Sequence, residues 1–429
     1  MNIDSLYTKF RASSGLTTDS RNCPLSSIFF ALKGESFNGN LYAKKALEAG
    51  CSYAVVDEDT GCDDERLVHV DNVLVALQTL ANYHRKMLNT PIIGITGSNG
   101  KTTTKELLAA VLKQKFNLHY TQGNFNNHIG VPLTLLQLKE EHNMAIIEMG
   151  ANHPGEIKDL CAIAEPNMGI ITNIGKAHLE GFGGIEGVIK TKKELYDFIR
   201  HNEGRLFVNG SDDLLMSLSE GVERSCYNSD NSVYKVSVES ALPTLTLKVE
   251  EGAQEYELKT QMVGEYNCIN VSAVLEIGHS FDIPFAEMKS ALEAYAPSNN
   301  RSQILDTEKN RLILDAYNAN PASMGVALDN FAKLDLPSKV VMLGAMKELG
   351  VYSVDEHQKV IDAISGDTFA LKIVVGDEFC TLNDKAEDVL FFQTLEDLKD
   401  YLTSKPINGA TILVKGSRSM KMETLVDLL

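Results

Sequence analysis

The order of apolar and polar residues divides the chain into three successive segments of mixed α/β type. The first segment contains two apolar runs of strand length, SIFFAL (27–32) and YAVVD (53–57). Apolar residues at helical spacing predict two helices, at 41–50 and 72–88. The sequence Asn-Thr-Pro at 89–91 predicts a link to the next segment, so we assign residues 1–90 to a small N-terminal domain.

The second segment begins with an apolar strand at 91–96, followed by a glycine-rich turn and a helix at 101–116. Three further stretches continue the pattern, two strands at 144–150 and 168–175 and a helix at 267–281. Residues 244–250 and 256–262 alternate apolar and polar residues on either side of Glu251 and Gly252, which predicts a hairpin. We assign residues 91–297 to a central domain and expect a linker at 296–300.

The third segment alternates strands and helices regularly. Four strand-like runs occur, at 312–318, 339–345, 371–377 and 410–416. Three helical stretches lie between them, at 322–334, 355–365 and 395–403. This alternation predicts a parallel sheet covered by helices, and we assign residues 298–429 to a Rossmann-like C-terminal domain.

Composition excludes several classes of protein. The 429 residues carry a net charge of −18, which disfavours binding to nucleic acid. No apolar run approaches the roughly 20 residues of a membrane span, and the first residues lack the pattern of a signal peptide. The seven cysteines include no CxxC pair, which favours reduced thiols over disulfides or a zinc site. We therefore expect a cytoplasmic protein, and we expect it to be a monomer.

A phosphate-binding loop is the clearest motif. It lies between a strand and a helix and comprises Gly97, Ser98, Asn99, Gly100, Lys101, Thr102 and Thr103. Glycines let backbone N–H groups converge on phosphate, lysine reaches the outer phosphates, and Thr102 can offer its hydroxyl to Mg²⁺. Ile95 stands where the longer form of the motif has glycine, so this is the shortened form T-G-x-x-G-K-[ST]. A glycine turn before a helix with an ordinary surface lysine is the alternative, and the strand–loop–helix context favours a mononucleotide site.

Two residues at strand ends are candidate metal ligands. Glu148 ends the run at 144–148, and His178 follows the strand at 168–175. Ligands for a phosphate-bound metal belong at such carboxyl ends, near the phosphate loop. Either residue alone could equally be an ordinary surface or loop residue.

Lys192 is a third candidate, because it falls on the apolar face of a helix that Lys190 and Lys193 avoid. A buried lysine tends to lose its proton, and a neutral amine can add CO₂ to form a carbamate that binds Mg²⁺. A lysine whose ammonium reaches out to water is the alternative, and periodicity alone favours that alternative.

Taken together, these motifs resemble the Mur ligase superfamily, which includes the folylpolyglutamate synthases. That family has the same phosphate loop, a metal-binding Glu and His, and a carbamylated lysine, which match the loop, Glu148, His178 and Lys192. The resemblance implies an α/β chain of three domains: a small N-terminal domain, a central P-loop mononucleotide-binding parallel sheet with an extra hairpin, and a Rossmann-like C-terminal domain. It also raises the case for the carbamate on Lys192.

Four further segments are similar to the branch of the family that joins D-alanyl-D-alanine to UDP-N-acetylmuramoyl-tripeptide: 18–34, 123–132, 148–152 and 315–321. That branch usually has Asp-Gly-His where this chain has Asn38-Gly39-Asn40, which leaves the details of UDP-sugar contact open. The resemblance implies ATP and Mg²⁺ as cofactors and an acyl phosphate intermediate.

The resemblance also implies roles for single residues. Catalytic roles would fall to Lys101, His178 and Lys192, and metal binding to Thr102, Glu148, His178 and Lys192. ATP would be bound by the phosphate loop together with Asn267, Asn270, Arg301 and Asp315. The UDP-linked substrate and the dipeptide would be bound by Ser20, Arg21, Lys33, Asn38, Asn126, Asn127, Asn318, Asn320, Lys415 and Arg418. For Asn267, capping of a helix is the alternative.

Two other functions share part of this sequence pattern. A folylpolyglutamate synthase-like ligase, which adds an amino acid to another carboxylate, has the same chemistry but lacks an N-terminal UDP-binding domain. A P-loop switch or motor needs a base-specificity signature or an activation loop, and neither is apparent in the sequence. The sequence therefore favours the amide ligase.

Overall fold

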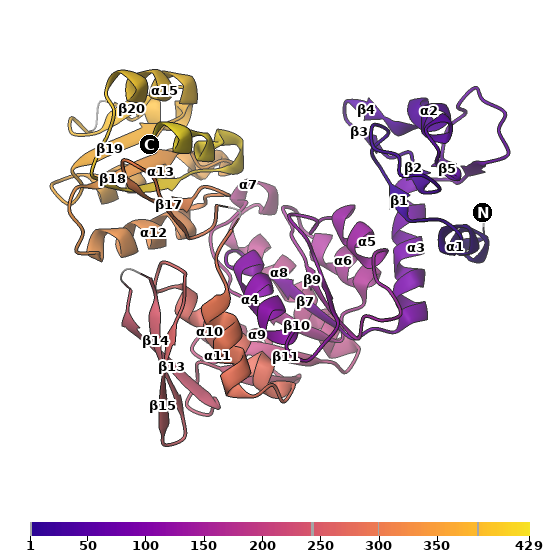
Figure 1. Cartoon of the computed structure of the whole chain (residues 1–429), viewed down its shortest axis with the longest axis horizontal. Coiled ribbons are helices and arrows are strands. Elements are labelled where there is room, and N and C mark those ends of the chain that lie inside the picture. Colours follow the sequence, from indigo (N-terminus) through magenta and orange to yellow (C-terminus); the bar gives the residue numbers. More distant parts are fainter. Residues whose placement is uncertain (1, 242–243, 299, 384–385) are drawn as a thin grey trace. The chain divides into compact units, whose positions relative to one another are not determined.

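The computed structural model describes residues 2–241, 244–298, 300–383 and 386–429 (Figure 1). The chain divides into two compact units. The first comprises Met1–Gly94, Phe116–Gly150 and Glu156–Met168, and the second comprises Ile95–Lys115, Ala151–Gly155 and Gly169–Leu429. Asn299, within the predicted linker, lies outside the described residues. Within those residues no helix is both long and apolar enough to span a membrane.

The first unit contains a four-stranded parallel sheet in the order β1-β2-β5-β6. Its strands are β1 (Leu16–Thr17), β2 (Ile28–Phe30), β5 (Tyr53–Val56) and β6 (Leu67–His69), which confirms the two predicted strands. The helices are α1 (Ile3–Arg11), α2 (Ala43–Glu48) and α3 (Val73–Leu88), and a short hairpin is formed by β3 (Lys33–Gly34) and β4 (Phe37–Asn38). Asn89 ends α3 in the left-handed conformation, with φ 51°, as the predicted link requires.

The middle of the chain builds a six-stranded sheet in the order β12-β11-β10-β7-β9-β8. The strands are β7 (Ile92–Thr96), β8 (Leu118–Tyr120), β9 (Met144–Glu148), β10 (Met168–Ile171), β11 (Arg205–Asn209) and β12 (Glu223–Tyr227). Helices of this region are α4 (Lys101–Leu112), α5 (Gly130–Leu135), α6 (Glu156–Ala164), α7 (Leu179–Phe182), α8 (Ile185–His201) and α9 (Asp213–Leu218). Every residue of β7 and β9 is buried, as expected for strands covered on both faces.

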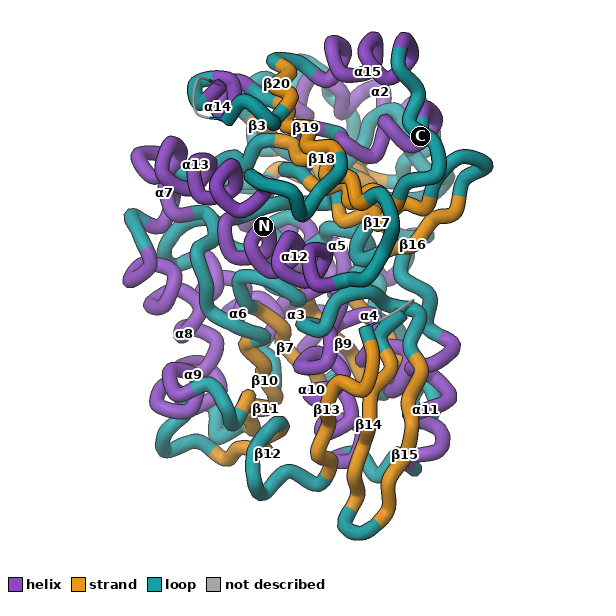
Figure 2. Tube along the Cα trace, turned by 90° about the vertical axis from the view of Figure 1, so that its left-hand side faces the viewer, coloured by secondary structure: helices purple, strands orange, loops and turns teal. Residues whose placement is uncertain are grey.

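The predicted hairpin is part of a three-stranded antiparallel sheet, whose strands lie side by side in Figure 2. The strands are β13 (Tyr234–Ser240), β14 (Thr246–Glu251) and β15 (Gln254–Lys259). Strand β13 was missed because its sequence, YKVSVES, presents mostly polar residues, and most of its side chains are exposed or half-buried. Helices α10 (Asn267–Ser280) and α11 (Phe285–Ala294) follow.

The C-terminal part of the second unit is a doubly wound sheet in the order β16-β17-β21-β18-β19-β20. The strands are β16 (Gln303–Asp306), β17 (Arg311–Asp315), β18 (Lys339–Gly344), β19 (Leu371–Val375), β20 (Leu390–Phe392) and β21 (Thr411–Lys415). Four of its neighbouring pairs are parallel, as predicted, and only the edge pair β16–β17 is antiparallel.

Helices cover both faces of this sheet (Figure 1). One face packs against α12 (Pro321–Lys333), α13 (Ser353–Ile364) and α14 (Asp377–Cys380). The other packs against α15 (Leu395–Ser404) and the 3₁₀ helix η5 (Met422–Leu428). Successive residues of β18 alternate between the two cores. The loops that form a pocket follow the carboxyl ends of β17, β18 and β21.

Candidate functional site

The phosphate loop connects β7 to α4, and its two glycines have conformations that other residues rarely adopt. Gly97 has φ +147°, and a Cβ there would lie 2.0 Å from Thr172 Oγ1. Gly100 has φ +78° and immediately precedes α4, whose first turn no side chain caps. The loop therefore brings unshielded backbone and the positive end of a helix to one place, which is the geometry of an anion site.

The segment after β10 holds this loop in shape. Thr172 Oγ1 and Asn173 Nδ2 donate to Asn99 O at 2.6 and 3.0 Å. Asn173 Oδ1 accepts from Asn99 N at 3.0 Å, and Ser98 Oγ donates to Gly175 O at 3.0 Å. Lys101 Nζ lies across the loop and donates to Gly97 O at 2.8 Å. These bonds fix the loop before any phosphate arrives, which lowers the cost of ordering it.

The two candidate ATP-binding asparagines, Asn267 and Asn270, lie at the start of α10, and both are buried. Asn270 Nδ2 donates to Asn267 Oδ1 at 2.9 Å, and Asn267 Nδ2 donates to Val263 O at 2.8 Å. Asn270 Oδ1 accepts from Thr104 Oγ1 at 3.2 Å and lies against Gly100. Capping is not the role of Asn267, because Tyr266 occupies the N-cap position. Through Asn270, the pair instead packs against Gly100 and the first turn of α4.

Arg301 and Asp315 lie near each other at the start of the C-terminal sheet. The Arg301 guanidinium lies 3.6 Å from the centroid of the Tyr317 ring, and the Arg418 guanidinium lies 5.4 Å from that centroid. Asp315 accepts a hydrogen bond from the Lys415 ammonium, and the Lys415 side chain is only 1% exposed. The structure therefore places Lys415 beneath the surface, paired with Asp315, and leaves Arg418 as the cation that reaches the surface.

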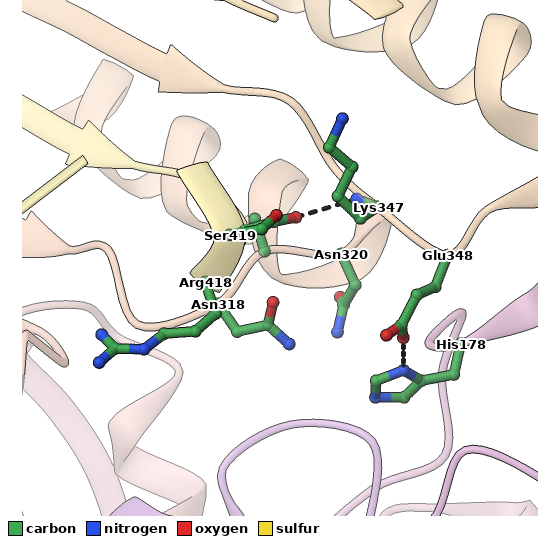
Figure 3. A pocket seen from close by; sticks show the side chains of 9 residues that line it. His178, Asn318, Asn320, Lys347, Glu348, Arg418 and Ser419 are labelled. Carbon is green, nitrogen blue, oxygen red and sulfur yellow. Dashed lines mark hydrogen bonds and ion pairs between the residues drawn. The ribbon is translucent and has the colours of Figure 1, made fainter. Parts of the chain in front are cut away.

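A pocket of about 340 Å³ opens at the carboxyl ends of these strands (Figure 3). Its lining comes from four loops, all of them in the second unit. The lining residues are His178, Asn318, Ala319, Asn320, Lys347, Glu348, Ser417, Arg418 and Ser419. The lining side chains include two cations, two amides, two hydroxyls, an imidazole and a carboxylate, and the two cations pair with Glu378 and Glu423. Such a lining suits a small polar ligand.

Asn320 links this pocket to the phosphate loop. Its Nδ2 donates to Asn99 Oδ1 at 2.8 Å, while its Oδ1 accepts from Ser323 N at 2.9 Å to cap α12. Lys347 and Glu348 are pocket residues that sequence reasoning missed. They lie in a loop without periodicity, and their contacts are with distant parts of the chain.

His178 and Glu348 face each other on the wall of the pocket (Figure 3). His178 Nδ1 and Glu348 Oε2 form a hydrogen bond, and this bond lowers the pKa of the Glu348 carboxyl. Each residue has a positive φ, 51° for His178 and 63° for Glu348. Non-glycine residues rarely adopt this conformation, and it clusters at functional sites.

Glu148 is at the carboxyl end of β9, as predicted, and only 1% of its surface is exposed. Its Oε1 accepts from Asn126 Nδ2 at 2.8 Å, so two candidate site residues are in contact. Asn127 has a structural role, because its Oδ1 accepts from Ile129 N and Gly130 N at the start of α5.

Lys192 lies in α8 and is 2% exposed, whereas Lys190 is exposed, so the predicted burial of Lys192 is confirmed. Its Nζ lies 5.5 Å from the centroid of the Phe182 ring. The alternative, in which the ammonium reaches out to water, is wrong because the side chain stays within the helix packing.

The N-terminal candidates form a connected polar network around the β3–β4 hairpin. Lys33 Nζ contacts Glu58 Oε1 at 3.0 Å and Asp57 Oδ1 at 3.2 Å, and Asn38 Nδ2 donates to Glu58 Oε2 at 2.7 Å. Asn40, 2% exposed, bonds Asp57 through both its amide atoms. The asparagines that replace Asp and His of the related branch are thus satisfied by carboxylates.

The other two N-terminal candidates lie upstream of that hairpin. Ser20 is buried, whereas the Arg21 side chain is 84% exposed and bonds Asp19. The hydrogen bonds from Arg21 lower the pKa of Asp19 to about 2. Arg21 is therefore a surface cation held in place by a neighbouring carboxylate.

The candidate metal ligands have the chemistry that Mg²⁺ requires. Thr102 supplies a hydroxyl in the first turn of α4, and Glu148 supplies a buried carboxylate. Hard oxygen donors of this kind suit Mg²⁺, which retains several waters and needs few protein ligands. In the parts of the chain that the structure describes, no cluster of three or more His, Cys, Asp or Glu side chains is arranged to hold a metal. Each of these two side chains therefore has donor chemistry that fits a phosphate-bound Mg²⁺.

Fold and site together define a P-loop nucleotide-binding protein with a polar substrate pocket beside the loop. Residues 95–278 match the Mur ligase middle domain, and residues 300–418 match the Mur ligase glutamate ligase domain. The chain belongs to the Mur ligase family.

Individual relatives are similar over nearly the whole chain. The UDP-N-acetylmuramoyl-tripeptide–D-alanyl-D-alanine ligase of Bacillus subtilis is 31% identical, over 96% of this chain and 92% of the relative. The ligase of the same name from Haemophilus influenzae is 33% identical, over the same shares. The crystal structure of MurF from Acinetobacter baumannii is 28% identical, with a TM-score of 0.89, and covers 100% of this chain and 98% of that chain. The three-domain α/β fold class predicted from the sequence is confirmed by these matches.

Proposed function

We propose that this chain is the ATP-dependent ligase that joins D-alanyl-D-alanine to the terminal carboxylate of UDP-N-acetylmuramoyl-tripeptide, a step of peptidoglycan precursor synthesis. The observation that carries the proposal is the Asn320–Asn99 hydrogen bond, at 2.8 Å, between the wall of a carboxylate-binding pocket and the phosphate loop. A ligase that forms an acyl phosphate needs its amine substrate beside the transferred phosphate. The relatives of this chain carry the same activity in their names.

The ligase reaction has two steps, formation of an acyl phosphate and formation of an amide. The tripeptide carboxylate attacks the γ-phosphate of ATP, which forms an acyl phosphate and releases ADP. The amine of the dipeptide then attacks the acyl carbon, which forms the amide, releases phosphate and gives up one proton. The protein contributes mainly positioning and charge neutralisation, because the phosphoryl group itself needs little covalent chemistry from it.

Named residues supply these contributions. The backbone of the loop Gly97–Thr103 and the Lys101 ammonium hold the phosphates, with the loop kept rigid by Thr172 and Asn173. Asn267, Asn270, Arg301 and Asp315 are the proposed supports of the nucleotide. Lys347 and Arg418 hold the dipeptide carboxylate, and Asn318 and Asn320 orient its backbone.

Mg²⁺, held by Thr102 and Glu148 with a second ion near His178 and Lys192, would neutralise phosphate charge. We propose that Lys192 carries a carbamate formed from CO₂. Burial supports this, because burial disfavours the ammonium form of lysine and so favours the neutral amine that adds CO₂. The donor atom would then be a carboxylate oxygen rather than an amine.

The predicted domain ranges enter as part of the proposal. Residues 1–90 would bind the UDP-sugar, 91–297 the ATP and 298–429 the dipeptide. Ser20, Arg21, Lys33, Asn38, Asn126 and Asn127 are the proposed contacts of the UDP-linked substrate. We further propose that the protein is a monomer and that it is cytoplasmic. The seven free cysteines support the cytoplasmic location.

The test is phosphate release from ATP with UDP-N-acetylmuramoyl-tripeptide, measured with and without D-alanyl-D-alanine. Release that requires both substrates, with a new amide product by mass spectrometry, is the expected result. L-alanyl-L-alanine is the matched control for the dipeptide, and a folate with glutamate is the control for the alternative ligase. Phosphate release that ignores the dipeptide, or that follows the folate pair, would overturn the proposal.

A further inference from the structure

The contact between His178 and Glu348 joins two loops that are far apart in the sequence. His178 lies between β10 and α7, inside the middle-domain match, and Glu348 lies after β18, inside the C-terminal match. The hydrogen bond between Nδ1 and Oε2 is therefore a link from one family domain to the other (Figure 3). Sequence reasoning gave His178 a metal-binding role and gave Glu348 none.

Backbone contacts reinforce this link. Glu180 N donates to Glu348 O at 3.3 Å. Gly350 permits the approach, because a Cβ there would lie 3.2 Å from Glu180 Cβ. Lys176 Nζ bonds Glu356 Oε1 at 2.8 Å, and the Glu356 side chain is only 7% exposed. Four contacts thus connect the segment 176–180 with the segment 348–356.

The Glu348 loop is also held from the side of its own sheet. Met346 N donates to His357 Nε2 at 3.0 Å, and Lys347 N donates to Ser417 Oγ at 2.9 Å. Both anchors bind backbone groups within two residues of Glu348, so they hold the backbone from which its side chain extends. The Glu348 side chain itself is 51% exposed, and its hydrogen bond to His178 is the contact that orients its carboxylate.

The chemistry of the pair decides what it can do. An ionised carboxylate has only acceptor atoms, so the proton of this hydrogen bond belongs to His178 Nδ1. When the imidazole is neutral, the other ring nitrogen, Nε2, carries the lone pair that a metal ion requires. Histidine ligands commonly donate their second N–H to a carboxylate, which fixes both the tautomer and the angle of the ring.

We propose that Glu348 is a positioning residue for His178, holding its imidazole in the Nδ1–H tautomer so that Nε2 is available to Mg²⁺. This inference rests on the proposed function of the site. Because Glu348 comes from the C-terminal part of the second unit, the pair is complete only while the two loops are in contact. The loop that carries Glu348 also lines the proposed dipeptide pocket. Contact between this loop and His178 therefore sets the tautomer of the metal-binding histidine, which couples dipeptide binding to phosphoryl transfer on the UDP-linked substrate.

A purely structural ion pair between the loops is the competing explanation. It predicts that removing Glu348 lowers stability and leaves the imidazole and its metal affinity unchanged. The positioning role predicts a change in both, without turnover. The variants are Glu348→Gln, which keeps a weaker acceptor, Glu348→Ala, which removes it, and His178→Ala as the reference. Glu180→Gln is the matched control, because it removes one negative charge beside the same loop.

The experiment is a titration of the full-length protein with Mn²⁺ in the presence of ADP, followed by electron paramagnetic resonance. Loss of the carboxylate partner should weaken Mn²⁺ binding by about 10- to 100-fold in Glu348→Ala, and by less in Glu348→Gln. Glu348→Ala combined with His178→Ala should bind no more weakly than His178→Ala alone, because both act through one ring. Glu180→Gln should match the wild type.

Nitrogen chemical shifts of the His178 ring give the second readout. The wild type should show a protonated Nδ1, and Glu348→Ala a mixture of tautomers. Unchanged Mn²⁺ affinity and an unchanged tautomer in both Glu348 variants would overturn the positioning role. If Glu348→Ala fails to fold, the Mn²⁺ affinity and the His178 tautomer of Glu348→Gln still test the positioning role. Absence of dipeptide-dependent phosphate release in the wild type would instead contradict the proposed function, which these two readouts do not measure.

Discussion

Asn320 Nδ2 donates a hydrogen bond of 2.8 Å to Asn99 Oδ1, and so joins the pocket wall to the phosphate loop. The same side chain caps α12 through its Oδ1, in a reciprocal capping box with Ser323. One asparagine thus serves both the stability of a helix and the alignment of two binding sites. The two roles can be separated, because they use different atoms of the amide.

Asn320→Ser should separate them. Serine is a good N-cap but is too short to reach Asn99, so we expect near-normal thermal stability and a catalytic rate lowered by about three- to tenfold, the scale of one hydrogen bond. Asn320→Ala should show the same loss of rate and an added loss of about 1 kcal/mol in stability. Steady-state kinetics and thermal unfolding check both expectations. A normal rate in Asn320→Ser would show that the link to Asn99 does not align the sites.

The fold was largely predictable because its signals are local. Apolar runs in the sequence predict the strand, loop and helix around Gly97. They also predict four parallel strands of the C-terminal sheet, and the structure has strands at these positions. Periodicity placed Lys192 on the apolar face of its helix but by itself favoured an ammonium that reaches out to water, whereas the structure buries the side chain. Strand β13 was missed because most of its side chains are polar. Strand β16 was missed because this short edge strand has no alternation of apolar and polar residues.

The site was less predictable, because its contacts are long-range. Glu348 and His178 are 170 residues apart, and no periodic pattern connects two polar loop residues over that distance. Lys415 is a second example. The sequence alone did not predict that its buried ammonium pairs with Asp315, which leaves Arg418 as the cation at the surface. Residue type and strand ends predict where a site lies, while the partners of each side chain depend on the tertiary structure.

Arg418→Gln should raise the KM for D-alanyl-D-alanine. Arg418 lines the pocket, and a hydrogen bond from a guanidinium to a carboxylate contributes about 1.5–3 kcal/mol, so we expect a rise of roughly 10- to 100-fold. The KM for ATP should change little. Lys421→Gln is the matched control, because Lys421 is an exposed cation three residues away that does not line the pocket. Equal effects of the two variants would point to net charge rather than to a specific contact.

Lys192→Ala should abolish most of the activity if the buried lysine carries a carbamate. Removing a group that stabilises charge in the transition state costs roughly 100-fold or more in kcat. A short-chain carboxylic acid added to the assay should restore part of the rate, because its carboxylate can occupy the space of the carbamate. Lys190→Ala, on the exposed side of α8, should behave as the wild type. Full activity of Lys192→Ala without any added acid would eliminate the carbamate.

His357 predicts an acid-sensitive stability of the second unit. Its ring is buried, with Nδ1 donating to Ser353 O at 2.7 Å and Nε2 accepting from Met346 N at 3.0 Å, which requires a neutral imidazole. Burial lowers the pKa of His357 below the usual 6.5, against the attraction of Glu378 and Glu356 and with the help of Lys347. The folded protein therefore binds fewer protons than the unfolded chain at mildly acidic pH.

The sign follows from that difference. The contribution of His357 is fully present above about pH 6.5 and is lost as the pH falls toward its lowered pKa. Chemical unfolding from about pH 7.5 down to pH 5 should show this decline in the wild type. His357→Gln should be less stable near pH 7.5, yet its stability should change less over the same range. His201→Gln, at an exposed position, should keep the wild-type slope. A wild-type slope in His357→Gln would assign the acid sensitivity to the other histidines whose pKa burial lowers, which are His84, His119 and His142.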